Sequence, residues 1–115
     1  MVSDGNAPAK DSAPYKMYIL VLENVDLGHA MLAVGHAVAA AMKTYKDTPE
    51  LRAWLDSSFR KVVCRVTPEQ FDKAKTYGLD YLEMTESALQ GANTALVFKP
   101  LYAWPNFFKS LQLYR

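Results

Sequence analysis

Two histidines are the side chains of this 115-residue sequence best suited to acid–base chemistry, because imidazole titrates near neutral pH. His29 and His36 are seven residues apart, so on a helix they share a face and are separated by about 10 Å along the axis. Two helical histidines that bind one metal ion need a spacing of about four residues. The spacing therefore excludes a two-histidine metal site, and no metal is expected. The functional interpretation that remains is that His29 acts in acid–base chemistry or contacts a phosphate, and that His36 supports it from deeper in the site.

A structural interpretation of the same histidines stays open. In it, His36 is a hydrogen-bonded core residue and His29 is a surface residue at the start of a helix. Cys64 lies within an apolar run, which favours a core side chain over a nucleophile. A single cysteine also excludes an intramolecular disulfide and is compatible with a reducing compartment, so we expect a cytoplasmic protein.

The polar segment 85–93 provides the remaining candidates, because it contains hydroxyl, carboxylate and amide groups. Such groups are typical of a site loop and also of any exposed connection. The candidate catalytic residues are His29, Thr85 and Glu86, and the candidate lining residues are Gly28, Ala33, His36 and Asn93. Segment 23–29 contains one glycine, so it matches neither a dinucleotide fingerprint nor a phosphate loop, and no cofactor is expected.

Apolar runs and helix caps predict the elements that must position these residues. Thr48-Pro49-Glu50 and Thr67-Pro68-Glu69-Gln70 have the spacing of helix starts. We predict strands over 17–22, 59–66, 79–84 and 94–98, and helices over 29–45, 48–55, 67–77 and 104–111. The order β-α-α-β-α-β-β-α predicts an α/β domain with three α/β/α layers around a mixed four-stranded sheet.

Composition limits the organisation of the chain. The length suits one domain, over 14–115, preceded by a flexible tail over 1–13. No apolar run is long enough to span a membrane, so no membrane partner is expected. The 13 basic and 12 acidic residues exclude a uniformly basic nucleic-acid coat. Basic residues nevertheless cluster at Arg60, Lys61 and Arg65, where an RNA backbone would be attracted.

The first helix predicts an interaction surface. Between residues 30 and 42 its one strongly polar side chain is His36, and a helix that is apolar nearly all round must be covered on several sides. A second subunit could cover it, which predicts a homodimer through this helix. The aromatic C-terminal segment is the alternative cover, with Tyr102, Trp104, Phe107, Phe108 and Tyr114.

From residue 15 onward, the chain resembles the type II peptidyl-tRNA hydrolase family. Lys16-Met17 opens an apolar strand, as in the family's K-M-V-L-V-V run. Residues 28–37 have the sequence G-H-A-M-L-A-V-G-H-A, where the family has G-K-x-A-x-Q-x-x-H-A. Residues 109–114 have the sequence K-S-L-Q-L-Y, which is similar to the family's closing G-x-L-K-L-Y. The resemblance implies the family's fold, a dimer and tRNA or another small ligand as partner.

The departures from the pattern affect the catalytic residues. His29 replaces the family's lysine, which would contact the negative substrate and polarise the ester, and Ala33 replaces its glutamine. The family's D-x-G-x-T segment has no clean counterpart, although Thr85, Glu86 and Asn93 lie in its neighbourhood. We therefore expect a peptidyl-tRNA hydrolase II-like domain that has lost hydrolysis and acts as a binding or interaction module. The alternative is an ester hydrolase with a rearranged site that uses His29.

Overall fold

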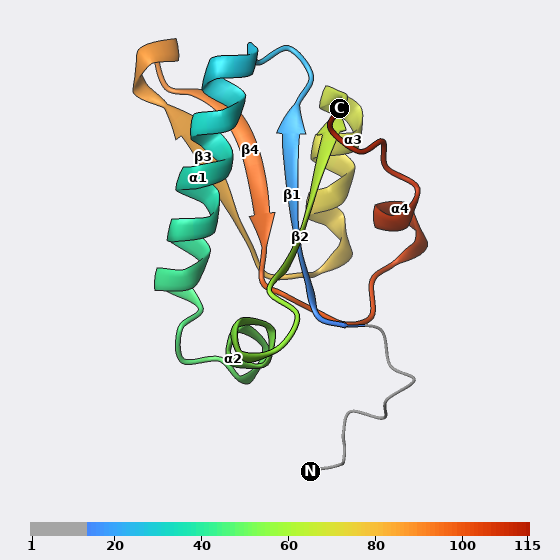
Figure 1. Ribbon diagram of the computed structural model, residues 1–115. Helices are drawn as coiled ribbons and strands as arrows, with labels where there is room; N and C mark the ends of the chain where they lie inside the picture. The colour runs from blue at the N-terminus through green and yellow to red at the C-terminus, as the bar shows by residue number, and fades with distance from the viewer. Residues whose placement is uncertain (1–13) are drawn as a thin grey trace.

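The computed structural model describes residues 14–115, and the tail predicted over 1–13 lies outside the described residues. The described elements follow the predicted order, with two short 3₁₀ turns added. They are β1 (Lys16–Leu22), α1 (Leu27–Thr44), α2 (Pro49–Asp56), β2 (Arg60–Val66), α3 (Pro68–Ala74), η1 (Lys75–Tyr77), β3 (Tyr81–Glu86), η2 (Ser87–Leu89), β4 (Ala92–Phe98) and α4 (Asn106–Lys109) (Figure 1). None of these helices is long and apolar enough to cross a membrane.

The sheet is mixed, as predicted, with the strand order β2-β1-β4-β3. β1 pairs with β2 in parallel and with β4 in antiparallel orientation, and β4 pairs with β3 in antiparallel orientation. The continuous apolar sequence of β1 suits a central strand, because helices pack on both of its faces. α1 and α2 lie on one face of the sheet, and α3 and α4 lie on the other (Figure 1).

The helix starts follow the predicted caps. The Thr48 hydroxyl accepts a hydrogen bond from the Leu51 amide and caps α2. Thr67 and Gln70 form a reciprocal capping box at the start of α3. The helical segment ends at Gly78, whose φ of 72° is easily adopted by glycine. These predictions are correct because each capping residue supplies hydrogen bonds to backbone groups that have no partner within the helix.

Three predicted boundaries of β3 and β4 are wrong. β3 begins and ends two residues later than predicted, and β4 begins two residues earlier, at Ala92. Gln90 and Gly91 adopt positive φ values of 60° and 77°, which allows a tight turn and lets strand pairing continue beyond the predicted ends. The predicted last helix over 104–111 is also too long, because α4 contains only Asn106–Lys109.

Within residues 14–115, α1 is covered on one face, and this copy of the chain does not provide the cover predicted for its other sides. Its buried residues form one alanine face, at Ala30, Ala33, Ala37 and Ala41. The aromatic C-terminal segment does not cover the rest of the helix, because Trp104 and Phe108 pack against the α3 side of the sheet. Tyr114 alone of that segment packs with the residues on the α1 side.

Tyr114 reaches the α1 side because the C-terminal segment pairs with the outer edge of β2. The Arg65 amide donates to the Gln112 carbonyl at 3.0 Å, and the Tyr114 amide donates to the Val63 carbonyl at 2.9 Å. This pairing covers the upper part of an edge strand that would otherwise expose unpaired backbone groups. It also fixes the Tyr114 ring beside the open face of β2.

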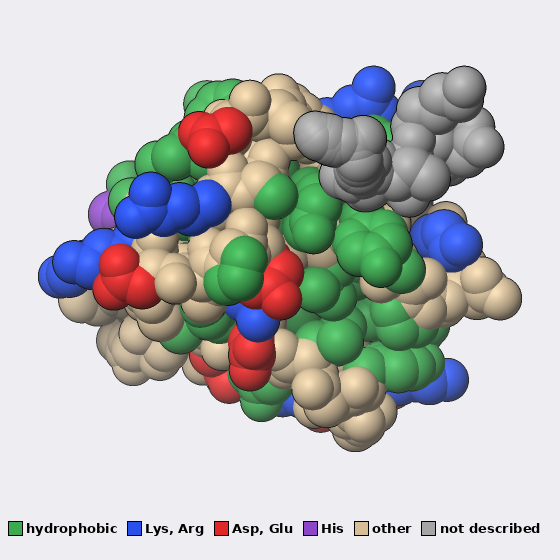
Figure 2. Space-filling model, turned by 90° about the horizontal axis from the view of Figure 1, so that it is seen from below, with side chains coloured by type: hydrophobic (Ala, Val, Ile, Leu, Met, Phe, Trp, Pro, Cys, Tyr) green, Lys and Arg blue, Asp and Glu red, His purple; other side chains and the backbone are tan. Residues whose placement is uncertain are grey.

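Lys99 joins three segments at the end of the sheet opposite the first turn of α1. The Nζ atom of Lys99 lies 3.0 Å from an Asp80 carboxylate oxygen and 3.7 Å from a Glu50 carboxylate oxygen. Its hydrogen bond to Asp80 raises the pKa of Lys99 above its usual value. In Figure 2, which shows this end of the molecule, basic and acidic side chains alternate beside an apolar area. The ion pairs link β4 to α2 and to the segment that precedes β3.

Phe59 has an unusual backbone conformation for a bulky residue, with a φ of 54°. Its amide donates to the Trp54 carbonyl and helps to end α2. The Phe59 ring lies 4.8 Å from the Trp54 ring, and the Lys61 Nζ atom lies 3.4 Å from the centroid of the Phe59 ring. These contacts offset the strain of a left-handed conformation that glycine would adopt freely.

We expect Phe59→Gly to be more stable than Phe59→Ala by about 1 kcal/mol, because both lose the ring and glycine alone relieves the strain. Urea unfolding monitored by circular dichroism measures the difference. The control is Ala39→Gly at an exposed position of α1, where glycine is expected to lower stability by about 1 kcal/mol. The prediction would be contradicted if Phe59→Ala were as stable as Phe59→Gly or more stable.

Candidate functional site

His29 is held by Asp26 at the start of α1. Asp26 is the N-cap residue, and one of its carboxylate oxygens accepts a hydrogen bond from the His29 amide at 3.3 Å. The other carboxylate oxygen lies 2.7 Å from His29 Nδ1. Because the two residues are three apart at the helix start, the cap and the side-chain pair form together. His29 is half-buried and Asp26 is exposed.

This pair can do acid–base chemistry. The hydrogen bond from His29 lowers the pKa of Asp26 below its ordinary value, so the carboxylate stays charged. When Asp26 accepts a hydrogen bond from Nδ1–H, the Nε2 atom of the imidazole is left as a base. Sequence reasoning missed Asp26, although an N-cap carboxylate three residues before a histidine could have revealed it.

The polar residues of the β3–β4 hairpin are not bonded to His29 in the part of the chain that the structure describes. Thr85 lies opposite Asn93, and Glu86 lies opposite Ala92. The pairing register shifts between Met84 and Thr85, so the regular alternation of side chains along β3 does not fix the sides on which Thr85, Glu86 and Asn93 lie. Among residues 14–115, no hydrogen bond or ion pair joins these three side chains to His29. Their site roles stay predictions.

Glu86 has a structural partner of its own. Its carboxylate accepts a hydrogen bond from the Ala88 amide at 3.1 Å, which caps the short η2 turn. Of the predicted catalytic residues, His29 thus has a carboxylate partner suited to acid–base chemistry. Glu86 instead has a backbone partner that stabilises a turn.

The three other candidate residues occupy different sides of α1. Gly28 is exposed in the first turn, and His36 is exposed two turns further along, so the interpretation of His36 as a core residue is wrong. Ala33 is 3% exposed and packs against the sheet. A glutamine at position 33, where the resembled family has one, would have to displace core side chains.

The cysteine considered as a nucleophile lies in the core. Cys64 is buried in β2, and burial raises the pKa of its thiol to about 11, which confirms the core interpretation. Residues 14–115 contain no group of three histidine, cysteine, aspartate or glutamate side chains that could hold a metal ion.

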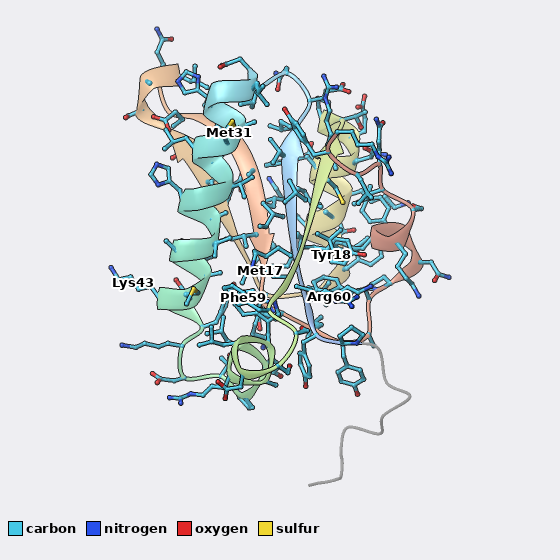
Figure 3. The ribbon with its side chains drawn as sticks, viewed as in Figure 1. Met17, Tyr18, Met31, Lys43, Phe59 and Arg60 are labelled. Carbon is cyan, nitrogen blue, oxygen red and sulfur yellow. The ribbon has the colours of Figure 1, made fainter. Side chains whose placement is uncertain are left out.

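A separate hollow of about 390 Å³ lies on the β2 side of α1. Its lining is apolar except for one tyrosine, and consists of Val21, Leu27, Ala30, Met31, Val34, Val63 and Tyr114. In Figure 3, Met31 lies on the side of α1 that is turned toward β1. His29 follows Leu27 by two residues, or about 200° around the helix, so it lies on the opposite side of α1 from the hollow.

Changes at Asp26 test the assigned pair. Asparagine also caps helices well, so Asp26→Asn should remove only the charge, and Asp26→Ala should remove the cap as well. We therefore expect the melting temperature to fall in the order wild type, Asp26→Asn, Asp26→Ala when it is measured at pH 6 by circular dichroism.

The difference in stability between wild type and Asp26→Asn should depend on pH. Because the pKa of Asp26 is lowered in the folded protein, its charge stabilises the fold above the unfolded pKa, and this stabilisation is lost as the pH falls through the folded value. The difference between wild type and Asp26→Asn should therefore disappear in strong acid. A difference that persists at pH 2 would contradict the assignment.

Comparison with known proteins places no further constraint on the site. No protein-family model matches the chain, and no curated protein matches it. The likeness to type II peptidyl-tRNA hydrolases therefore stays a prediction from the residues quoted above.

Proposed function

We propose that this chain is an interaction module with a peptidyl-tRNA hydrolase II-like fold, without hydrolytic activity, which pairs with a second copy through α1. The observation that carries the proposal is the exposed outward side of one helix, where Leu32 lies, with Leu27 and Met31 next to it on the β2 side. Leu27, Met31 and Leu32 expose 63%, 68% and 45% of their surface. Clustered apolar exposure of this kind is typical of interaction sites.

The outward face of α1, which we define as Gly28, Leu32, Gly35 and Ala39, suits contact with another helix. All four residues are exposed, and a Cβ atom added at Gly35 would meet nothing within 4 Å. A glycine inside a helix costs about 1 kcal/mol relative to alanine, and nothing within the described chain requires one here. A helix that crosses close to Gly35 would require it.

Charge favours an antiparallel crossing of the two copies of α1. Asp26 caps one end of the helix, and Lys43 lies exposed in the last turn at the other end (Figure 3). A two-fold axis near Gly35 would bring Asp26 of one copy near Lys43 of its partner, on both sides of the axis. The opposed helix dipoles add to this attraction.

The lack of hydrolysis is supported by the surroundings of the two replaced motif residues. Ala33 lies against the sheet and offers no hydrogen-bonding side chain. The described hollow of α1 lies away from His29 and is lined almost entirely by apolar groups. A peptidyl-tRNA ester needs polar groups beside the reacting carbonyl.

A second function, ester hydrolysis by a rearranged site, is favoured by one observation. The 2.7 Å contact between Asp26 and His29 resembles the carboxylate–imidazole half of a catalytic triad. In that case Nε2 of His29 would activate a water molecule, and peptidyl-tRNA or a related ester would be the substrate.

Substitutions on the outward face of α1 test self-association. Gly35→Ala should raise the stability of the monomer, since its methyl group has open space, and should weaken the dimer at the crossing point. Leu32→Glu should weaken the dimer more strongly, by at least about tenfold in the dissociation constant. Sedimentation velocity over a concentration series measures association, and chemical denaturation measures stability.

The control for self-association is Leu55→Glu, which changes an exposed apolar residue of α2 and should leave the dissociation constant within about twofold. A wild type that stays monomeric at millimolar concentration would overturn the proposal. So would a Gly35→Ala variant that dimerises more tightly than wild type.

Hydrolysis of peptidyl-tRNA separates the two functions. We expect wild type, His29→Ala and His36→Ala to release peptide no faster than buffer does. His36→Ala is the matched control, because His36 lies on the same helix, is exposed and has no carboxylate partner among the described residues. Hydrolysis by wild type that is lost in His29→Ala, lowered in Asp26→Asn and kept in His36→Ala would establish the rearranged site instead.

A further inference from the structure

The open face of β2 carries two cations with an apolar residue between them. Lys61, Val63 and Arg65 alternate along the strand and therefore point to the same side of the sheet. That side is the one covered by α1, because Val63 packs with the α1 cluster and lines the hollow. The hollow thus lies between a lysine and an arginine on one strand.

Neither cation has a carboxylate partner among residues 14–115. Lys61 donates to the Phe59 carbonyl at 2.8 Å, and its Nζ atom lies over the rings of Phe59 and Trp54. Arg65 donates to the Glu23 carbonyl at 3.4 Å, and its guanidinium carbon lies 5.9 Å from the centroid of the Tyr114 ring. Carbonyls and aromatic faces position the two cations without neutralising their charge.

The partial burial of the Lys61 ammonium group also favours the binding of an anion beside it. Partial burial lowers the pKa of Lys61, because the ammonium group has lost water without gaining a negative partner. A carboxylate that binds beside it would supply that partner. Arg65 presents a planar fork of donors, which matches the geometry of a carboxylate.

We propose that the hollow between α1 and β2 docks an extended acidic peptide. An apolar side chain of the peptide enters the hollow, and flanking carboxylates pair with Lys61 and Arg65. This surface lies on the side of α1 that faces β2, and it does not depend on self-association through the outward face.

The spacing of the strand defines the peptide. Lys61 and Arg65 are four residues apart, which corresponds to about 13 Å along a strand. An extended partner that carries acids at its first and fifth positions and an apolar residue at its third has the same spacing on one side. Leu27 and Met31 form the α1 wall of the hollow, and their exposed, flexible side chains can adapt to the apolar residue.

A peptide fits these features better than a nucleic acid. The walls of the hollow are mainly aliphatic, whereas bases bind by stacking on aromatic rings. The two aromatic rings nearest the cations, Phe59 and Tyr114, lie beneath Lys61 and Arg65 rather than free for a base. The formal net charge of +1 also gives little attraction for a polyanion beyond this strand.

The test uses the full chain and a dye-labelled seven-residue peptide with a central leucine and a glutamate two positions to either side. Fluorescence anisotropy should show saturable binding that weakens as salt is added. Met31→Gln or Leu27→Gln should weaken binding at least about fivefold. The double variant Lys61→Gln/Arg65→Gln should weaken it at least about tenfold and remove most of the salt dependence.

Matched controls use the same substitutions outside the hollow. Leu55→Gln changes an exposed leucine of α2, and Lys46→Gln removes an exposed cation that follows α1. Both should bind the peptide within about twofold of wild type. Circular dichroism melting of every variant identifies any loss of affinity that arises from unfolding.

Three results would overturn the proposal. One is the absence of saturable binding at millimolar peptide. Another is equal binding of a peptide whose glutamates are replaced by lysines or whose leucine is replaced by serine. The third concerns a dye-labelled ten-nucleotide RNA. The proposal would be overturned if this RNA bound more tightly than the peptide at equal salt and if its binding depended on Lys61 and Arg65. Sedimentation velocity of the same variants measures self-association. A failure of peptide binding can therefore be distinguished from a failure of dimerisation.

Discussion

The packing of four alanines against the sheet determines how α1 meets the rest of the molecule. Ala30, Ala33, Ala37 and Ala41 are the buried residues of the helix, and their small side chains let the helix backbone approach the strands closely. The long apolar side chains of α1 cannot enter this contact, so they flank it. Leu27 and Met31 therefore lie beside the sheet rather than under the helix, and the outward face of α1 and the hollow have one cause.

The same packing separates the two kinds of chemistry on α1. Residues on the β2 side of the alanine face form the apolar hollow, while His29 lies on the other side and is paired with Asp26. Charge is separated in a similar way. Lys99 takes carboxylate partners at one end of the sheet, whereas Lys61 and Arg65 lie against aromatic rings. A formal net charge of +1 thus combines lysines that are paired with carboxylates, such as Lys99, with one strand whose cations remain available to a ligand.

The fold could be predicted from the sequence where the signals are local. Thr48 and Thr67 mark helix starts through hydrogen bonds to nearby amides, and the apolar run of β1 indicates a strand covered on both faces. The hairpin boundaries and the cover of α1 could not be predicted in this way. The former depend on the backbone of Gln90 and Gly91, and the latter depends on which sheet face receives Trp104 and Phe108. Composition assigns those aromatic residues to a core but not to a particular side.

The candidate site was predictable to the same limited extent. His29 was found because its residue type and its place at a helix start are local properties, and the spacing to Asp26 would have extended that inference. The hollow was not found, because its wall residues come from β1, α1, β2 and the C-terminal segment. No periodicity within one element relates Met31 to Val63 or Tyr114. They meet because β2 pairs in parallel with β1 and because the chain end pairs with the outer edge of β2. A surface assembled by two non-local pairings has no signature in a single sequence, whereas a capped histidine has one.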